Sequence, residues 1–292
     1  MDLQLQGKRA LVTGSSSGIG EGIAKALAKE GAVVVVHGRR ENEAVRVAKA
    51  ITDGGGTAAV ALGDLARDDG AAHVAKLALA AFGGIDIVVN NAGAYFRDEW
   101  TAPDPARWLD LYNQNVVSVV RIIQHFLPQM KERGWGRFIQ IGSGLASAPA
   151  ATFAAYGATK SAIVNLTVSL AKGLARTGVT ANTVSPGPVL TPNIEAWIKD
   201  IAGKKGWHGE WDEVERRFVA EFFANLESII GPRSFLDLGE RRFVAEFFEN
   251  PTGRIGRVEE VVDLVAFLAS PRADYINGAN LRVDGGYVPT TN

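Results

Sequence analysis

Short apolar runs alternate with amphipathic segments along most of the chain. Residues 9–13 are apolar, and apolar residues then recur at helical spacing from Ile23 to Ala28. Gly31 ends this segment, and residues 32–36 are an alanine followed by four valines. Continuous β-branched runs are typical of strands buried on both faces of a parallel sheet. This part of the chain therefore predicts a strand, a helix and a second strand, which together form a βαβ unit.

The same alternation of strand and helix patterns continues to the end of the sequence. Parallel strands need crossover connections, and these connections are right-handed. We therefore expect an α/β fold in three layers: an open, doubly wound, parallel sheet of seven strands with helices on both faces, formed by a single domain over residues 1–292. After the first unit, the predicted elements are helices at about 41–53, 68–82, 105–130, 153–176 and 258–269, and strands at about 57–62, 85–90, 137–141, 179–184 and 280–283.

Composition narrows the classes of function. Apolar residues make up 47% of the chain, charged residues 22%, and the formal net charge is -1, so neither disorder nor binding to nucleic acid is expected. The chain has no cysteine, and its four histidines lack metal-ligand spacing, so a metal site is not expected. No signal-peptide pattern and no apolar run near the ~18 residues of a membrane span is present. We expect a soluble cytoplasmic protein with a small-molecule partner and no membrane association.

A glycine-rich loop follows the first predicted strand directly. Its sequence is Gly14-Ser-Ser-Ser-Gly18-Ile-Gly20, and the first predicted helix begins within it. Glycine lets the backbone turn tightly and approach a pyrophosphate, while the helix N-terminal N–H groups face the anion. Glycine-rich turns also serve plain chain reversal, but at the first strand–helix junction of a βαβ unit the loop predicts a dinucleotide site.

The end of the second predicted strand indicates which dinucleotide binds. An NAD site usually places a carboxylate here for the ribose 2′-hydroxyl, whereas this chain has Arg39 and Arg40. Two guanidinium groups suit a 2′-phosphate, so NADP(H) is favoured and NAD(H) stays possible, because the arginines could instead lie at a solvated helix start. Asp64, after the third strand, could reach the adenine or cap the next helix.

Tyr156 and Lys160 lie four residues apart in a predicted helix. At that spacing both side chains leave the same face of the helix. An ammonium beside a phenol favours the phenolate and lowers the pKa of the tyrosine, so the pair could exchange a proton with a substrate oxygen near neutral pH. A surface pair on an ordinary helix is the alternative when this motif is taken alone.

Taken together, the motifs of the chain occur in the order and spacing of a known family. The chain resembles the short-chain dehydrogenase/reductase family, and within it the 3-oxoacyl-[acyl-carrier-protein] reductases, whose fold is Rossmann-like. The resemblance extends from Gly7 to about Gly286. The motifs that carry it are residues 13–20, residues 90–93, Ser143, Tyr156-x-x-x-Lys160, residues 185–187 and residues 280–286.

The resemblance implies roles for individual residues. Tyr156 would be the acid/base, Lys160 would lower its pKa and hold the nicotinamide ribose, and Ser143 would bind the substrate oxygen. Asn115 would anchor a proton-relay water. The predicted cofactor contacts are Gly14, Ser16, Ser17, Gly18, Ile19, Gly20, Arg39, Arg40, Asp64, Leu65, Asn91, Ala92, Gly93, Tyr156, Lys160, Pro186, Gly187, Val189 and Thr191.

These side chains also suit the chemistry independently of the family. Hydride transfer to a carbonyl builds negative charge on its oxygen, which a serine hydroxyl can stabilise while a phenol supplies the proton. The cofactor carries the hydride. We therefore expect an NADP(H)-dependent oxidoreductase that interconverts a carbonyl and a secondary alcohol. The alternatives are an NAD-linked alcohol or polyol dehydrogenase and a non-catalytic dinucleotide-binding regulator, although a regulator would not need Ser143, Tyr156 and Lys160.

A nine-residue sequence occurs twice near the C-terminal end. Residues 215–223 recur residue for residue at 240–248, within a segment at about 188–253 that, by the resemblance, closes over substrate. Each copy places two phenylalanines on one helical stripe, which needs an apolar surface to cover it. We expect one copy to occupy the lid position and the other to form an added helix–loop excursion. An enlarged lid is the alternative.

Two further expectations concern the surface and the pocket. The resemblance implies a homotetramer or homodimer, with Ile122, Phe126, Phe267 and Leu268 on helices that pack between subunits, although each could be intrachain core.

The pocket is expected to suit an apolar or mixed substrate, such as a 3-oxoacyl chain or a cyclic ketone. Its predicted walls are Leu145, Phe153, Pro188, Val189, Trp197 and the duplicated helices.

Overall fold

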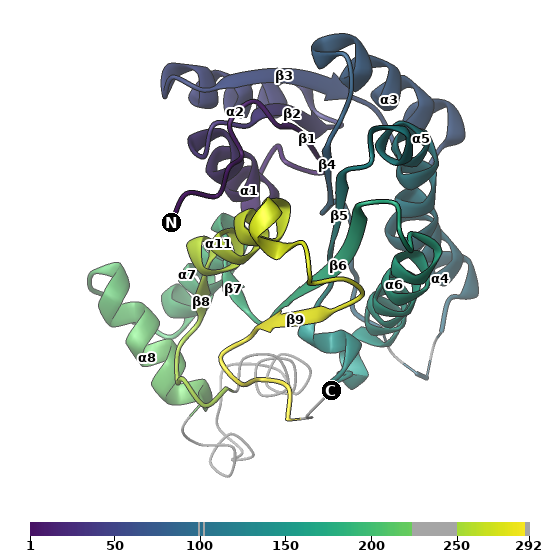
Figure 1. Ribbon diagram of the computed structural model, residues 1–292. Helices are drawn as coiled ribbons and strands as arrows, with labels where there is room; N and C mark the ends of the chain where they lie inside the picture. The colour runs from purple at the N-terminus through teal and green to yellow at the C-terminus, as the bar shows by residue number, and fades with distance from the viewer. Residues whose placement is uncertain (99, 102, 224–249, 290–292) are drawn as a thin grey trace.

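Valine-rich strands form the centre of the fold in the computed structural model, which describes residues 1–98, 100–101, 103–223 and 250–289. Within these residues, seven strands pair in parallel, as the sequence predicts, and their order in the sheet is β3-β2-β1-β4-β5-β6-β9 (Figure 1). The order reverses between β1 and β4, so a crevice lies at their carboxyl ends. The strands are β1 (Arg9–Val12), β2 (Val33–Gly38), β3 (Thr57–Leu62), β4 (Ile87–Asn90), β5 (Gly136–Ile141), β6 (Val179–Pro186) and β9 (Asn280–Val283).

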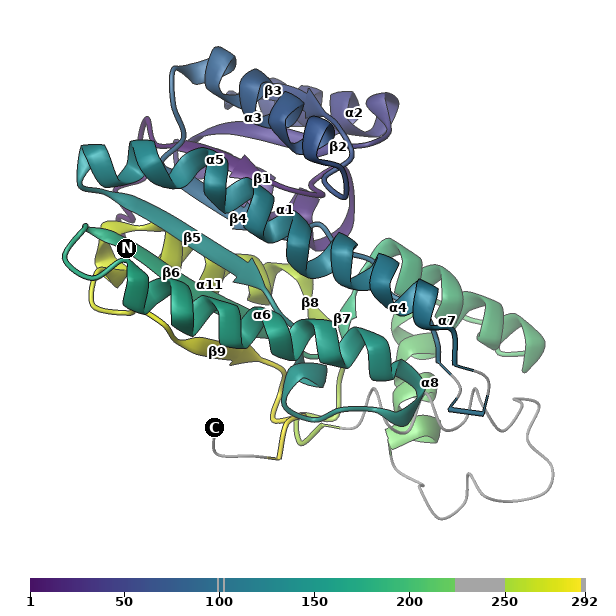
Figure 2. The ribbon, with the colours of Figure 1, turned by 90° about the vertical axis from the view of Figure 1, so that its right-hand side faces the viewer.

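Helices cover both faces of this sheet and complete a three-layer α/β fold (Figures 1 and 2). Each face has its own apolar cluster, because side chains alternate along a strand. Val34 and Val36 pack with one set of helices and Val35 packs with the other. The first set is α1 (Gly18–Lys29), α2 (Glu41–Asp53) and α11 (Val258–Ala269); the second is α3 (Asp68–Phe82), α5 (Ser118–Arg133) and α6 (Ala154–Gly173).

The helical stretch predicted at about 105–130 consists of three pieces. Helix α4 (Pro105–Tyr112) begins at Asp104, whose carboxylate accepts hydrogen bonds from two backbone N–H groups of the first turn. A π-helical turn (Asn113–Val117) then leads into α5. Such wide turns occur frequently at functional sites. Here the turn contains Asn115, which is buried at 2% exposure.

The described part of the segment at about 188–253 contains two helices that form a small layer of their own. Helices α7 (Pro192–Lys204) and α8 (Trp211–Phe223) share a separate apolar cluster, in which Phe218 is fully buried and its ring lies 5.8 Å from that of Trp197. Strand β7 (Val189–Leu190) pairs with β8 (Gly256–Arg257) at the base of this layer. The first copy of the repeated sequence therefore forms most of α8, whereas the second copy lies outside the described residues.

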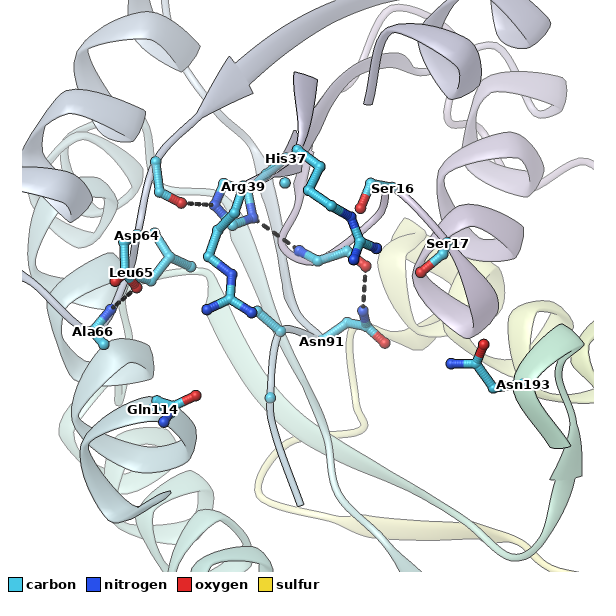
Figure 3. Close-up of a pocket in the computed structure, with 16 residues that line it drawn as sticks. Ser16, Ser17, His37, Arg39, Asp64, Leu65, Ala66, Asn91, Gln114 and Asn193 are labelled. Atoms are coloured by element: carbon cyan, nitrogen blue, oxygen red, sulfur yellow. Dashed lines mark hydrogen bonds between the residues drawn. The ribbon is translucent and has the colours of Figure 1, made fainter. Parts of the chain in front are cut away.

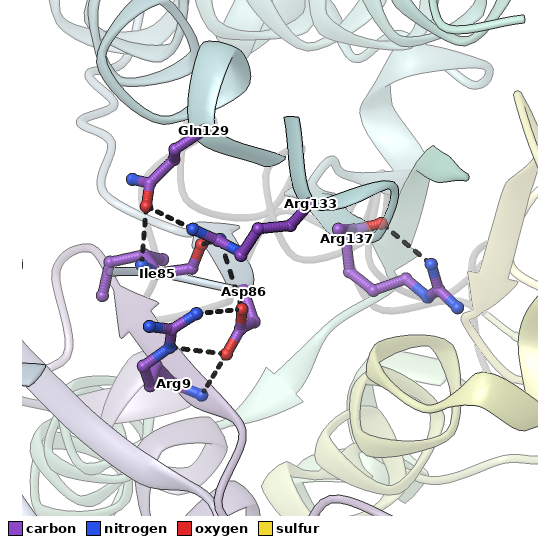
Figure 4. A network of polar contacts seen from close by, with 7 residues as sticks. Arg9, Ile85, Asp86, Gln129, Arg133 and Arg137 are labelled. Atoms are coloured by element: carbon purple, nitrogen blue, oxygen red, sulfur yellow. Dashed lines mark hydrogen bonds and ion pairs between the residues drawn. The ribbon is translucent and has the colours of Figure 1, made fainter. Parts of the chain in front are cut away.

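An ion-pair network joins the amino ends of the strands, at the edge opposite the crevice (Figure 4). The Arg9 guanidinium donates two hydrogen bonds, of 2.8 and 2.6 Å, to the carboxylate of Asp86, and Arg133 lies 3.2 Å from the same carboxylate. Burial opposes ionisation of Asp86, but the hydrogen bonds from Arg9 outweigh it and lower the pKa of this carboxyl. The network links β1, the segment before β4, and α5. It lies away from the carboxyl ends of the strands, where the crevice is.

Three of the four residues expected between subunits are part of the chain's own core. Ile122, Phe126 and Leu268 are fully buried, and Phe267 is partly buried against the same interior. Packing inside one chain therefore explains why these four side chains are apolar, and a surface for the predicted assembly has to be sought at other residues.

Among the described helices, none combines the length and the apolar character that crossing a bilayer requires.

Candidate active site

The glycine loop is packed directly against the end of β4. Gly14 has a φ of +64°, and a Cβ built there would lie 2.8 Å from the Cα of Ala92. A Cβ on Gly20 would lie 2.4 Å from the side-chain nitrogen of Asn91. That nitrogen donates to the carbonyls of Thr13 and Gly14 at 3.0 and 3.1 Å. Only glycine fits these two positions, so the loop and the β4 end form one rigid unit.

His37 links the same loop to the third strand. Its Nδ1 accepts a hydrogen bond from the Gly14 backbone N–H at 2.9 Å, so its Nε2 carries the proton and lies 3.1 Å from the Gly63 carbonyl (Figure 3). Burial lowers the pKa of His37 to about 4, and the ring is therefore neutral at physiological pH. The ends of β1, β2 and β3 are thus connected through one imidazole. Sequence spacing contains no signal for this role.

A cavity of about 550 Å³ lies between the glycine loop and the ends of β2 and β3. Arg39 extends from the end of β2 into this space, with no acidic side chain at that strand end (Figure 3). Arg40 also lines the cavity but forms an ion pair with Glu43 in the first turn of α2. Asp64 lines it too, and its carboxylate accepts a hydrogen bond from the Ala66 N–H at 3.0 Å, in the turn before α3. The N-cap residue of α3 is Arg67, so the alternative that Asp64 caps the next helix is wrong.

A second cavity of about 380 Å³ adjoins the first and is lined by Ser143, Tyr156 and Lys160. The two cavities share Ser17, Asn91, Gly93 and Asn193 as lining residues, so together they form a continuous space at the carboxyl edge of the sheet. Every residue predicted to contact the cofactor lines one of the two. In the second are Gly18, Ile19, Gly20, Tyr156, Lys160, Pro186, Gly187, Val189 and Thr191; in the first are Gly14, Ser16, Arg39, Arg40, Asp64, Leu65 and Ala92.

The catalytic candidates lie together, but their electrostatics differ from the sequence-based expectation. Burial raises the pKa of Tyr156 to about 12, although its hydrogen bond with Ser143 acts in the opposite direction. Burial also lowers the pKa of Lys160 to about 8. The Lys160 ammonium lies 5.5 Å from the centre of the Tyr156 ring and donates to the Ile141 carbonyl at 2.7 Å. The predicted lowering of the tyrosine pKa is therefore wrong for this structure, because burial is the largest influence on the pKa and outweighs the hydrogen bond with Ser143.

Asn115 lies behind the catalytic cavity and does not line it. Its side-chain oxygen accepts from the Ala94 N–H at 2.8 Å, and its nitrogen donates to the Ala94 carbonyl at 2.9 Å and to the Thr159 hydroxyl at 3.0 Å. The Asn115 amide therefore holds the segment that follows residues 90–93 against α6. The implied anchoring of a relay water stays a prediction.

The walls of the catalytic cavity were only partly anticipated. Leu145, Phe153 and Val189 line it, whereas Trp197 packs on Phe218 and Pro188 lines a different cavity. Missing from the prediction are Tyr95 and Asn193, among other lining residues. Tyr95 follows residues 90–93 closely, so adjacency could have indicated it. Asn193 comes from α7, which folds back over the sheet edge only in the tertiary structure.

Among the described residues, no group of acidic or histidine side chains is arranged to hold a metal ion.

Comparison with known proteins agrees with this geometry. The family model described as short chain dehydrogenase matches residues 8–202, and a second one, described as enoyl-(acyl carrier protein) reductase, matches residues 240–288. The chain belongs to the short-chain dehydrogenase family and is an oxidoreductase.

Relatives match along the whole chain. The uncharacterised oxidoreductase YvrD of Bacillus subtilis is 34% identical over 289 residues, covering 99% of both chains. L-Sorbose reductase of Gluconobacter frateurii, solved with NADPH and L-sorbose, has a TM-score of 0.85 and 28% identity, covering 99% of this chain and 100% of that one. Gluconate 5-dehydrogenase of Burkholderia cenocepacia, solved with NADP and tartrate, has a TM-score of 0.79 and 31% identity, covering 99% and 98%.

The neutral state of His37 has a measurable consequence for stability. Unfolded histidine takes up a proton near pH 6.5, whereas folded His37 does so near pH 4, so its contribution is lost as the pH falls from 6.5 towards 4. We expect this residue to account for about 2 kcal/mol of lost unfolding free energy between pH 7 and pH 5. Urea titrations at both pH values measure it.

The His37→Asn variant should lack this part of the pH dependence, because asparagine does not titrate. At pH 7 it should also be less stable by about 1–3 kcal/mol, since the Gly63 carbonyl loses its donor. His73→Asn, at an exposed site on α3, is the matched control and should leave the pH dependence nearly unchanged. An equal pH dependence in His37→Asn and wild type would contradict the assignment.

Proposed function

We propose that the protein reduces the carbonyl of a small, uncharged substrate to a secondary alcohol with NADPH. The observation that carries this proposal is the meeting of Ser143, Tyr156 and Lys160 in a cavity continuous with the glycine loop. A dinucleotide fits this space, because a Cβ on Gly14 or Gly20 would collide with the β4 end and the bare backbone is therefore left to face the phosphates. When bound, the cofactor supplies the hydride.

Three side chains of the site have separate roles in the rest of the reaction. The Ser143 hydroxyl oxygen accepts from the Leu145 N–H at 3.2 Å, which leaves its proton to donate to the substrate oxygen. Tyr156, with a pKa of about 12, is protonated at neutral pH and can pass its proton to that oxygen as charge develops. The Lys160 ammonium beside the ring stabilises the phenolate that this transfer leaves. A protonated tyrosine is the form that the reduction requires at this step.

The removal of one oxygen atom tests this mechanism. Tyr156→Phe keeps the ring and its packing but has no proton to donate, so turnover should fall by about 10³-fold or more. NADPH oxidation with a panel of ketones gives the rate, and quenching of protein fluorescence by NADPH gives cofactor affinity, which should stay within about twofold. If the variant retained substantial turnover, Tyr156 would not be the proton donor.

Arg39 supports NADPH over NADH as the cofactor. Its guanidinium reaches into the first cavity, whose strand end offers no carboxylate for a free 2′-hydroxyl. L-Sorbose reductase and gluconate 5-dehydrogenase, both similar to this chain over nearly its whole length, are solved with NADPH and NADP.

Two arginine variants separate the contributions of neighbouring charges. Arg39→Ala should raise the Michaelis constant for NADPH about tenfold or more and leave that for NADH nearly unchanged, because only NADPH has the 2′-phosphate. Arg40→Ala should have a smaller effect, since Glu43 already pairs with Arg40. Steady-state kinetics with both cofactors measures this. Equal or tighter use of NADH by the unmodified protein would contradict the assignment and favour an NAD-linked dehydrogenase.

The catalytic cavity supports an uncharged substrate. Lys160 is the only charged side chain among its described lining residues, and its ammonium is engaged with the Ile141 carbonyl. Apolar walls come from Leu145, Phe153 and Ile194, and an unpaired carboxylate against such walls would be costly. A 3-oxoacyl chain and a cyclic ketone both satisfy these conditions.

The packing of the first copy of the repeated sequence supports a lid position for it. Phe218 of the first copy is fully buried between α7 and α8, and Glu215 forms two 2.6 Å hydrogen bonds with Arg257 at the start of α11. We infer that the first copy occupies the lid position and that the second is an added excursion.

Matched truncations in the two copies test this assignment. Phe218→Ala should cost about 3–4 kcal/mol of unfolding free energy, because a buried ring is lost. Phe243→Ala, in the same local sequence, should cost less than about 1 kcal/mol. Deletion of residues 215–239 joins Val214 to the second copy and rebuilds α8 residue for residue, so this shortened chain should fold and stay active. Equal costs of the two truncations, or failure of the deletion to fold, would contradict the assignment.

We also propose that the protein forms a homodimer or homotetramer through α4, the π turn and α6. Leu109 and Tyr112 are 72% and 46% exposed there, beside an apolar cavity of about 670 Å³ that also includes Val120 and Leu166. Sedimentation equilibrium should give a multiple of the chain mass. A monomer at micromolar concentration would contradict this.

A further inference from the structure

The five residues 94–98 form a strap beside the catalytic cavity, which Ala94 and Tyr95 line, and its first end is fixed by Asn115. Both backbone groups of Ala94 bond to the Asn115 amide, at 2.8 and 2.9 Å. The same amide bonds to the Thr159 hydroxyl at 3.0 Å. One buried side chain thereby fixes the start of the strap relative to both the π turn and α6.

The other end of the strap is fixed at the start of α6. The Asp98 N–H donates to the Thr152 carbonyl at 2.9 Å, and the Asp98 carboxylate accepts from the Ala155 N–H at 2.6 Å. Ala155 lies in the first turn of α6, where backbone N–H groups lack intrahelical partners. It directly precedes Tyr156, so the capping bond at Asp98 orients the part of α6 that carries the proton donor.

Between these ends, Tyr95 completes a group of three aromatic rings. Its ring centre lies 6.2 Å from that of Phe153 and 6.1 Å from that of Tyr156, at interplanar angles of 65° and 68°. The rings of Phe153 and Tyr156 are themselves 6.5 Å apart at 70°. Edge-to-face contacts of this kind hold rings in a defined orientation. Tyr95 also lines the catalytic cavity and is 64% exposed, so its ring is available to a ligand there.

The other walls agree with an apolar ring as occupant. Leu145 is buried in the same cluster as Phe153, and Pro192 and Ile194 from α7 line the facing part of the cavity. A saturated or aromatic ring can contact these apolar groups without leaving polar atoms unpaired. An open chain of the same carbon number makes fewer simultaneous contacts and loses more conformational freedom on binding.

We propose that Tyr95 determines specificity for neutral ring ketones, holding the ring of the substrate beside Tyr156, and that Asp98 is a positioning residue that keeps the strap and α6 together. This inference rests on the proposed carbonyl reduction. Of the two substrate classes that suit the cavity, a 3-oxoacyl chain and a cyclic ketone, it selects the cyclic ketone. It also gives a role to two residues outside the serine, tyrosine and lysine of the reaction.

The test compares cyclohexanone with 3-hexanone, which have the same number of carbons and no charge. The unmodified protein should prefer cyclohexanone by about tenfold or more in kcat/KM. Tyr95→Ala should lower kcat/KM for cyclohexanone about tenfold, mainly through KM, and change that for 3-hexanone less than about twofold. Tyr95→Phe, which keeps the ring, should retain the preference for cyclohexanone over 3-hexanone. Affinity for NADPH should be unchanged in both variants.

Asp98 variants test the positioning role separately. Asp98→Ala should lower kcat for both ketones about tenfold, because the first turn of α6 loses its cap beside Tyr156. Asp98→Asn keeps an acceptor oxygen and should restore most of that loss. A purely structural effect would instead appear as an equal loss of unfolding free energy in both variants with kcat unchanged, and would overturn the positioning role.

The outcomes separate this inference from the proposed function. No NADPH oxidation by the unmodified protein with any ketone, together with no effect of Tyr156→Phe, would overturn the reductase itself. Reduction of both ketones with no preference for the ring, or an equal effect of Tyr95→Ala on both, would overturn only the role of Tyr95. If Tyr95→Ala does not fold, Tyr95→Leu keeps bulk without a ring and should show the same selective loss.

Discussion

Close packing of the glycine loop against the end of β4 is the constraint on which both cavities depend. A side chain at Gly14 or Gly20 would collide with Ala92 or Asn91, so the loop can lie this close only as bare backbone. Asn91 and His37 then satisfy the backbone groups that the close approach leaves without strand partners. Because buried polar groups must be paired, these two side chains hold the loop open towards the ligand instead of allowing it to collapse.

Burial controls the chemistry of the site as much as charge does. It keeps His37 neutral, raises the pKa of Tyr156 and lowers that of Lys160. The three shifts have one physical cause, which is the cost of placing a charge in a medium that solvates it poorly. The result is a phenol that is protonated at neutral pH and an ammonium that loses its proton more readily than an exposed lysine does.

The strap makes the position of the proton donor depend on residues distant in sequence. Asn115 holds one end of it and Asp98 secures the other end to the first turn of α6. The aromatic ring between them faces the same space as Tyr156. In the proposed mechanism, substrate shape and proton transfer are therefore linked through hydrogen bonds that cross from the sheet edge to the helix.

The sequence by itself determined the order of strands and helices, because continuous valine runs, glycine stops and helical periodicity are local patterns. It also determined the glycine loop and the Ser143, Tyr156 and Lys160 set, since the carboxyl ends of parallel strands must meet at one edge. The tertiary structure decided what depends on contacts across the chain. It placed His37 between two strand ends, raised the pKa of Tyr156 through burial, put Asn115 behind the cavity, and packed Trp197 on Phe218. Burial and the partners of a side chain are properties of neighbours that spacing along the chain does not encode.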